Sequence, residues 1–312
     1  MNSYNSALNK LKRNNISIKN EIVSIKKLLN RVVAKDVISP SNYPLCDNTS
    51  LDGYAVNSKE TKSLNVRKSK KFKIIKTLAA GDNPNIKKIP KFSAIEVMTG
   101  SIIQKPFDTI IPVEQAHLSS NSTKSNYIIL KNKLKKNEYI RPAGSDFKKG
   151  DKIVKRGQFI NSTHILAFKT LGIEKVLVKK KPKLVFYPTG NELSENKKIP
   201  NWKIRNSNTS YLENYIKNLP VNFEVKKILR DDQSINFKKE ITKNMNSRSD
   251  IVITSGAVSA GKFDFIPKII NKFKLKSMFK GVAIRPGKPM MFAKFKNSMC
   301  FFGLPGNPIS SA

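Results

Sequence analysis

The chain has 312 residues, enough for two or three domains of about 100 to 200 residues each. No apolar stretch reaches the roughly 18 residues of a membrane span, and the polar segment from Asn2 to Asn9 lacks a signal-peptide core, so we expect a soluble cytoplasmic protein without a membrane partner. The formal charge of +37 invites a nucleic-acid interpretation, but the excess Lys is spread along the whole chain together with abundant Asn and Ile, which share A/T-rich codons. We therefore favour genome composition as its cause over a nucleic-acid interface, and still expect the charge to attract anionic ligands.

The Cys and His residues exclude several kinds of site. Cys46 and Cys300 form neither a CxxC pair nor a disulfide framework, and buried or idle thiols are the expected interpretation. The only histidines, His117 and His164, are isolated, which leaves almost no basis for a His-ligated zinc site or a Ser/His/Asp triad. Chemistry must come from carboxylates, hydroxyls, backbone amides and basic groups.

The first half of the chain changes its apolar pattern once. From Asn20 to Val37 the apolar residues follow helical spacing, and the prolines at 40 and 44 require an extended segment, so we predict a helix that ends before Ser39. Between Val56 and Tyr139 short alternating runs, separated by turn residues, predict a small β-rich domain. The runs are Phe72 to Ile75, Ala94 to Met98, Thr109 to Val113 and Tyr127 to Leu130.

The second half alternates strand and helix patterns. The stretch from Ile165 to Leu171 predicts a helix closed by Gly172, and the joint between the halves is expected at Lys179 to Pro182. The βαβ rhythm beyond it predicts a parallel sheet covered by helices. Its segments are Lys183 to Tyr187, Ser207 to Leu219, Phe223 to Leu229, Phe237 to Asn244 and Ile251 to Thr254.

The loop after the strand at Ile251 is the best candidate for a phosphate site. The apolar run breaks into small residues from Ser255 to Asp264, and helical spacing resumes at Ile266. A strand, loop and helix in this order leave backbone N–H groups free to hold an anion.

Only 22 residues are acidic, so an acid beside Gly, Pro or Thr in a turn is informative. Such acids are Asp47, Asp52, Asp146, Glu192 and Asp264. Each alone is more often a turn former or helix cap. Glu192 and Asp264, however, follow strands of the predicted parallel sheet, whose carboxyl ends bind ligands, and hard oxygen ligands beside a phosphate site suit Mg²⁺.

A further loop, Arg285 to Pro289, carries two fixed cations. Two prolines frame Gly-Lys and stiffen the turn that holds Lys288, and Arg285 adds a second charge, an arrangement that suits a small oxyanion. Two solvated cations in a Lys-rich chain are an equally good interpretation of this loop alone.

These motifs, in this order, resemble the MoeA family of molybdopterin molybdenumtransferases and the related E domains of plant proteins and of animal gephyrin, over about Glu21 to Ala312. The segments that carry the resemblance are Asp47 to Val56, Met98 to Gly100, Arg141 to Asp151, Thr189 to Leu193, Ser255 to Asp264, Pro286 to Pro289 and Leu304 to Pro308.

The resemblance implies an α/β multidomain fold. An elongated helix and linker domain I comprises residues 1–50 and 139–178, a small β-rich domain II comprises 51–138, and a MogA-like α/β domain III with a mainly parallel sheet comprises 179–312. Family members continue past Pro308 with a helix and a small C-terminal β-domain. We therefore expect that domain to be absent, and the chain to be a fragment of a longer product or a truncated form.

The family reaction is the last step of molybdenum cofactor synthesis, in which molybdate is inserted into adenylylated molybdopterin with release of AMP. The resemblance implies catalytic roles for Asp52, Thr99, Asp146, Glu192 and Asp264, with Mg²⁺ held by Glu192 and Asp264. It implies substrate contacts at Thr189, Gly190, Ser255, Gly256, Ser259, Gly261, Gly306 and Asn307, and molybdate contacts at Arg285, Lys288 and Pro289.

Partners follow from the same resemblance. Asp52 and Thr99 lie outside domain III, and in the family such residues reach the pocket from the other subunit of a homodimer. The adenylyltransferase that supplies the substrate is a second expected partner. One departure concerns the phosphate loop, where Ala257 replaces a usual glycine and matters if that residue needs positive φ.

Three other functions stay open. The half from Lys183 onward also resembles a MogA-like molybdopterin adenylyltransferase, although that domain occurs without the upstream segments. A non-catalytic binding or scaffold homologue is the second alternative. A nucleic-acid binder, favoured by charge alone, is the third.

Overall fold

The computed structural model describes residues 1–119, 126–230, 232–258 and 265–312. The chain forms two compact units: the α/β unit, residues 1–35, 156–162 and 175–312, and the β-rich unit, residues 36–155 and 163–174. The division into three domains stays a prediction. Among the helices of the described ranges, none combines the length and the apolar character needed to cross a membrane.

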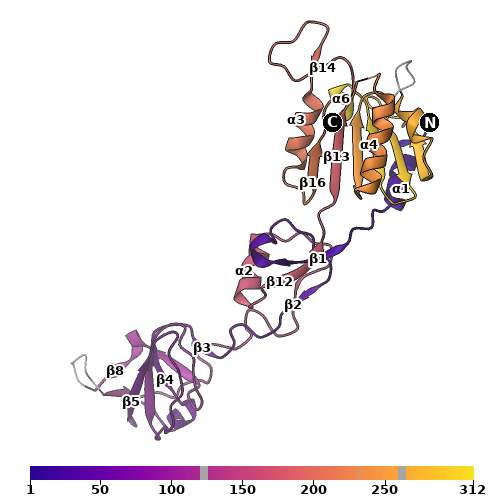
Figure 1. The fold of residues 1–312 in the computed structure, drawn as a ribbon. Coiled ribbons are helices and arrows are strands. Elements are labelled where there is room, and N and C mark those ends of the chain that lie inside the picture. The colour runs from indigo at the N-terminus through magenta and orange to yellow at the C-terminus, as the bar shows by residue number, and fades with distance from the viewer. Residues whose placement is uncertain (120–125, 231, 259–264) are drawn as a thin grey trace. The chain divides into compact units, whose positions relative to one another are not determined.

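A six-stranded sheet with the order β16-β13-β17-β20-β19-β18 forms the centre of the α/β unit (Figure 1). Its strands are β13 Lys183–Pro188, β16 Asn222–Val225, β17 Ile251–Ser255, β18 Leu275–Lys280, β19 Met291–Phe295 and β20 Cys300–Leu304. The first four in spatial order are parallel, and β19 is antiparallel to both of its neighbours. The predicted, mainly parallel sheet is confirmed.

Helices complete this unit. They are α1 Tyr4–Arg13, α3 Ser207–Ile216, α4 Ser234–Asn246, α5 Ile266–Ile270 and α6 Pro308–Ser311. In α4 the apolar residues Phe237 and Ile241 are four apart, so they share one face, and both are fully buried against Val185 and Val252 of the sheet. The side chain of Asn206 caps α3 by accepting a hydrogen bond from the backbone N–H of Thr209.

The helix α1 lies in the segment that the sequence analysis took only as polar. Its Ala7 is buried with Phe279 and Phe292, and Ser3 caps its first turn. The residues Tyr4, Ala7, Leu8 and Leu11 recur at helical spacing among polar neighbours, so this amphipathic pattern does indicate the helix in the sequence.

The prediction of a helix between Asn20 and Val37 is wrong. Residues Asn20–Ser24 form β1, which pairs antiparallel with β12, Lys175–Lys179, and only the 3₁₀ turn η1, Ile25–Lys27, is helical. The apolar residues here are largely β-branched, which favours strands, and β12 supplies the backbone partners that the sequence alone does not reveal.

In the β-rich unit a second six-stranded sheet has the order β7-β4-β6-β5-β9-β8. Its strands are β4 Gly53–Val56, β5 Lys70–Leu78, β6 Ser93–Val97, β7 Thr109–Pro112, β8 His117–Leu118 and β9 Tyr127–Leu130. Apolar clusters that include Val56 and Phe72, and Ala55 and Ile95, fill its core. All four alternating runs predicted from the sequence are strands.

The chain also forms short elements outside the two six-stranded sheets. They are β2 Val37–Ile38 paired with β11 Lys152–Val154, β3 Asn48–Thr49 paired with β10 Ile140–Arg141, the turns η2 Ser58–Thr61 and η3 Val113–Gln115, and α2 Ser162–Thr170. Gly172 follows α2 with φ +71°, as expected of a residue that ends a helix.

Both cysteines are free thiols. Cys46 is exposed, whereas Cys300 is buried in β20, and burial raises the pKa of its thiol. The buried thiol at 300 therefore stays protonated and inert at neutral pH.

Candidate functional site

Three adjacent parallel strands of the α/β unit end at the same level. Pro188 of β13 pairs with Ser255 of β17, and Ser255 pairs with Leu304 of β20. The loops that follow these strands therefore begin side by side at the carboxyl edge of the sheet, where α/β folds bind ligands.

Hydrogen bonds join these loops. The backbone N–H and the hydroxyl of Thr189 both donate to the carbonyl oxygen of Ser255, at 3.0 and 2.6 Å, and the N–H of Gly256 donates to the carbonyl of Leu304 at 2.9 Å. Gly256 has φ +95°, and a Cβ there would lie 2.6 Å from the carbonyl oxygen of Thr189. Only glycine allows this contact between the two loops.

Ser255 carries an oriented hydroxyl at this edge. The residue is 1% exposed, and within the ranges that the structure describes its Oγ has no hydrogen-bond partner. A buried polar atom normally has one, so this hydroxyl fits a site that is completed by a ligand. Ser259, Gly261 and Asp264, which the sequence analysis assigned to the same loop, lie outside the described residues.

Ala257, the residue that replaces a glycine of the family pattern, has φ +54°. The left-handed region costs an L-residue roughly 1 to 2 kcal/mol, because its Cβ approaches the following carbonyl oxygen. Ala257 therefore occupies a position with positive φ, where glycine would be less strained than alanine.

Glu192 lies in the turn between β13 and β14, Leu193–Ser194. Gly190 has φ +138°, and a Cβ on it would lie 2.5 Å from Oε2 of Glu192, so the carboxylate occupies the space that a side chain would take. The residue is exposed, and its carboxylate makes no hydrogen bond or ion pair within the described ranges. An exposed carboxylate without a protein partner is a suitable ligand for Mg²⁺, which takes one or two carboxylates and keeps several waters.

The described part of the chain contains no group of three or more His, Cys, Asp or Glu placed to hold a metal ion. A metal at this edge would therefore depend on Glu192 together with oxygen atoms of the ligand or of residues outside the described ranges.

The loop from Arg285 to Pro289 follows β18. Because β18 runs in the direction of β20, this loop also lies at the carboxyl edge, and a Cβ on Gly287 would be 3.5 Å from the carbonyl oxygen of Ser310 in α6. Arg285 and Lys288 are exposed, and neither side chain has an ion-pair or hydrogen-bond partner within the described ranges. Their charges are available to an anion.

The turn before α6 is held by a residue that the sequence analysis missed. Asn208, 6% exposed in α3, donates from Nδ2 to the carbonyl oxygen of Gly306 at 3.1 Å. Asn307 accepts from the N–H of Ile309 at 3.0 Å and so caps α6. A buried amide on a helix has no distinct sequence signal, which explains the omission.

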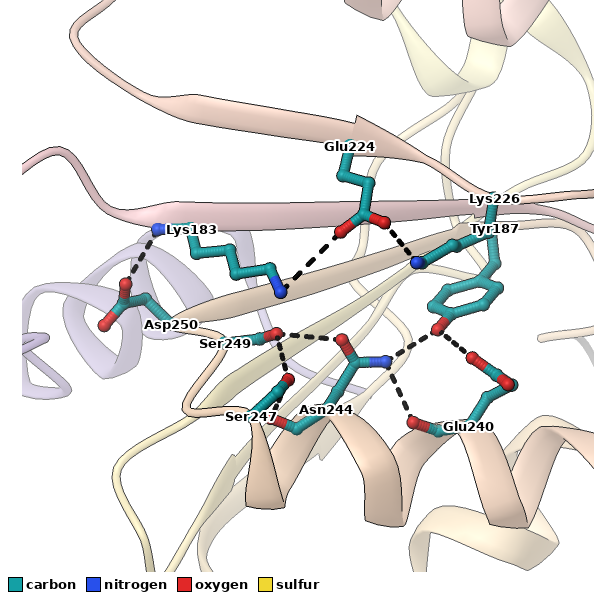
Figure 2. Close-up of polar contacts among 9 residues, drawn as sticks. All are labelled: Lys183, Tyr187, Glu224, Lys226, Glu240, Asn244, Ser247, Ser249 and Asp250. Atoms are coloured by element: carbon teal, nitrogen blue, oxygen red, sulfur yellow. Dashed lines mark hydrogen bonds and ion pairs between the residues drawn. The ribbon is translucent and has the colours of Figure 1, made fainter.

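A polar network ties the carboxyl half of β13 to α4 (Figure 2). The hydroxyl of Tyr187 donates to Glu240 at 2.7 Å and accepts from Nδ2 of Asn244 at 2.6 Å, and Oγ of Ser249 donates to Oδ1 of Asn244 at 2.8 Å. Burial, and then the hydrogen bond to Glu240, raise the pKa of Tyr187 above its usual range. The network holds the strand end from which Thr189 departs.

Asp52 and Thr99 are neighbours in the β-rich unit. The N–H and the hydroxyl of Thr99 donate to Oδ1 of Asp52 at 2.6 and 2.7 Å, and these bonds, the hydroxyl's first, lower the pKa of Asp52. Both residues are exposed. Asp52 is therefore ionised at neutral pH.

Two further acids of this unit also have protein partners. Asp146 forms an ion pair with Arg141, and both side chains are about two-fifths exposed. Asp47 accepts from the N–H of Ala143 at 2.8 Å, as expected of a turn former. The structure thus gathers the predicted site residues into two groups, one at the carboxyl edge in the α/β unit and one in the β-rich unit.

The fold is that of a multidomain α/β protein in which several loops meet at the carboxyl edge of a mainly parallel sheet. Residues 2–172 match the family model described as "MoeA N-terminal region (domain I and II)", and residues 186–312 match the "Probable molybdopterin binding domain". The chain belongs to the MoeA family, as its motifs predicted.

Curated relatives and solved structures support the same family assignment. The chain is 32% identical to the molybdopterin molybdenumtransferase of Staphylococcus aureus strain N315 over 92% of its own length and 66% of the relative's, and 33% identical to that of Haemophilus influenzae over 93% and 69%. The crystal structure of a molybdopterin biosynthesis MoeA protein from Pyrococcus horikoshii superimposes with a TM-score of 0.85 at 28% identity, covering 99% of this chain and 75% of that one. The chain thus spans about two thirds of the length of the first of these relatives. The predicted α/β multidomain fold is confirmed.

Proposed function

We propose that this protein inserts molybdate into adenylylated molybdopterin and releases AMP, the last step of molybdenum cofactor synthesis. The observation that carries the proposal is the joining of the loops at Thr189, Ser255 and Leu304 at the carboxyl edge, with a buried Ser255 hydroxyl that lacks a partner in the described ranges. The names of the curated relatives support it.

The proposed reaction requires little covalent chemistry from the protein itself. The two sulfurs of the substrate bind molybdenum as one molybdate oxygen leaves as water, and one water cleaves the phosphoanhydride, so the metal stays hexavalent and no oxidant is needed. The loop amides near Gly256 would hold the phosphates, and Arg285 and Lys288 would hold the molybdate by charge. Binding and orientation are then the main contributions of this chain.

Magnesium is part of the proposal. Glu192 and Asp264 are the carboxylates that would hold Mg²⁺. The bound ion would neutralise charge on the phosphoanhydride. Ser259, Gly261 and Asn307 remain proposed substrate contacts, and Pro289 a proposed molybdate contact.

We further propose that a homodimer completes the site, with Asp52 and Thr99 supplied to the pocket by the other copy, and that Asp146 is a further catalytic residue. Mixed dimers test this. Asp52→Asn and Glu192→Gln chains are each expected to be inactive, and refolding them together should restore about a quarter of wild-type activity, because about half of the dimers are hybrids with one intact site. If verified hybrid dimers recover no activity, Asp52 and Glu192 act in the same site of the same chain.

A molybdopterin adenylyltransferase is the competing enzyme within the same class of domain. It would leave the region matched over residues 2–172 without a role, which favours molybdate insertion. We propose the adenylyltransferase instead as the enzyme that supplies the substrate. A cytoplasmic location stays a prediction from the sequence.

The test is AMP release from adenylylated molybdopterin with and without molybdate. The wild-type chain should release AMP only when molybdate is present, and Glu192→Ala or Asp264→Ala should abolish release while circular dichroism shows a folded protein. Wild-type turnover in either variant would refute the assignment of these residues.

A further inference from the structure

One guanidinium group converges on the turn that carries Glu192. Nη1 of Arg230 lies 3.1, 3.2 and 3.0 Å from the carbonyl oxygens of Gly190, Asn191 and Leu193. Arg230 reaches them from the loop after β16, where Leu229 bridges to Thr189 and accepts from the N–H of Gly190 at 3.0 Å. Two loops from neighbouring strands therefore meet at this cation.

The remaining carbonyl of the turn is also bonded. The carbonyl oxygen of Glu192 accepts from the N–H of Ile204 in β15, Ile204–Arg205, at 2.9 Å. Every backbone carbonyl from Gly190 to Leu193 thus has a donor. Arg230 contacts three of the four, and the carbonyl of Asn191 also accepts from Nζ of Lys203. Hydrogen bonds from a charged donor are roughly twice as strong as neutral ones, and Arg230 is the charged donor to the carbonyls of Gly190 and Leu193 on either side of the turn.

These contacts of the turn involve backbone carbonyls and not the carboxylate of Glu192. Arg230 forms no ion pair with Glu192 in the described part of the chain, and the carboxylate instead lies over Gly190, whose missing side chain makes the room. Arg230 holds the backbone on both sides of the acid without neutralising it. The carboxylate of an acid fixed in this way stays accessible to a ligand at the carboxyl edge.

We propose that Arg230 is a positioning residue that holds the turn from Gly190 to Leu193 so that the carboxylate of Glu192 is presented to the ligand. The inference rests on the proposed function in one respect, namely that Glu192 serves a bound ligand. The guanidinium suits this role because its rigid plane fixes Nη1, which faces three carbonyl oxygens, whereas Lys offers a compact ammonium on a flexible stem.

The test combines amide hydrogen exchange with turnover in the full chain. In Arg230→Gln the peptides covering residues 189–194 should exchange at least about tenfold faster, because they lose charge-assisted hydrogen bonds. The Mg²⁺ concentration for half-maximal AMP release should rise by about the same factor, and Arg230→Lys should recover part of both effects. The matched control is Arg205→Gln, since Arg205 donates to a single carbonyl, that of Asn196, at 3.3 Å in the neighbouring loop.

The two readouts separate this inference from the proposed function. Unchanged exchange of residues 189–194 in folded Arg230→Gln and Arg230→Lys would overturn the role of Arg230, whatever the activity. Faster exchange with an unchanged Mg²⁺ requirement would overturn the positioning role and leave a structural one. If wild type releases no AMP, the proposed function fails, and the exchange data alone decide whether Arg230 holds the turn.

Discussion

The candidate acids of the two units are held in opposite ways. In the α/β unit, Glu192 has its backbone bonded on both sides, while its carboxylate has no partner in the described ranges. In the β-rich unit the carboxylates themselves are engaged, Asp52 with Thr99 and Asp146 with Arg141. The first arrangement presents a carboxylate without a protein partner to a ligand, whereas in the second each carboxylate would share its charge between a protein partner and a ligand.

The largest expected effect tests the free carboxylate. Glu192→Gln keeps the size of the side chain and removes its charge, so the rate of molybdate-dependent AMP release should fall by about 100-fold or more if that charge acts in the transition state. Glu195→Gln is the matched control, since Glu195 is an exposed acid on the same segment, and its rate should stay within about twofold of wild type. If both variants lost the same factor in the rate of AMP release, the effect would be a general one of charge. Glu192 would then have no role that Glu195 lacks.

The next effect concerns the strand that carries the turn. Tyr187→Phe deletes the hydroxyl between Glu240 and Asn244 and leaves buried polar groups with fewer partners, so the free energy of unfolding should fall by about 1 to 2 kcal/mol. Tyr211→Phe, whose exposed hydroxyl lies 3.5 Å from the carbonyl of Ala312, should change it by less than about 0.5 kcal/mol. Urea titration measures both, and equal values would mean that the network of Figure 2 does not stabilise the fold.

A smaller effect has the opposite sign. Ala257→Gly removes the Cβ of a residue with φ +54° and should raise the free energy of unfolding by about 0.5 to 1 kcal/mol, less the packing lost with its methyl group. Ala116→Gly is the control, because Ala116 is also partly buried but has φ −81°, and glycine there should destabilise by a similar amount. A destabilised Ala257→Gly variant would show that packing outweighs backbone strain in this loop.

The smallest effect tests the engaged carboxylate. Thr99→Val deletes the hydroxyl that lowers the pKa of Asp52 most, so that pKa should move up toward its ordinary value of 3.8, as measured by carboxyl NMR titration. A depressed pKa stabilises the folded state above the unfolded pKa, and this stabilisation disappears as pH falls through the folded value. Thr99→Val should accordingly lose less stability than wild type on acidification below about pH 4. An unchanged titration of Asp52 would contradict the geometry of the pair.

Local pattern and topology predicted much of the fold. The strand at Tyr127 alternates between more exposed and more buried residues, as a half-buried strand requires, and the βαβ rhythm placed the loops of Thr189 and Ser255 at one edge of the sheet. The prediction of a helix from Asn20 to Val37 failed because this segment begins with the strand β1. The partner of β1 is β12, which begins at Lys175, far along the chain.

The site was predictable only in part, for a related reason. Asp52 and Asp146 were selected by residue type and turn position, but their bonds to Thr99 and Arg141 depend on how strands and loops meet. The role of Arg230 could not be predicted from the sequence, because an Arg after a strand is common. Only its contacts with the turn at Gly190 distinguish it. Tertiary contacts made by backbone carbonyls leave no pattern in the sequence.

The central claim is tested most directly by the stoichiometry of a single turnover. With adenylylated molybdopterin and limiting molybdate, wild type should release one AMP for each molybdenum incorporated and none without molybdate, with AMP measured by chromatography and bound molybdenum by elemental analysis. AMP release that does not depend on molybdate, or consumption of ATP to form the adenylylated pterin, would contradict the account and favour the adenylyltransferase.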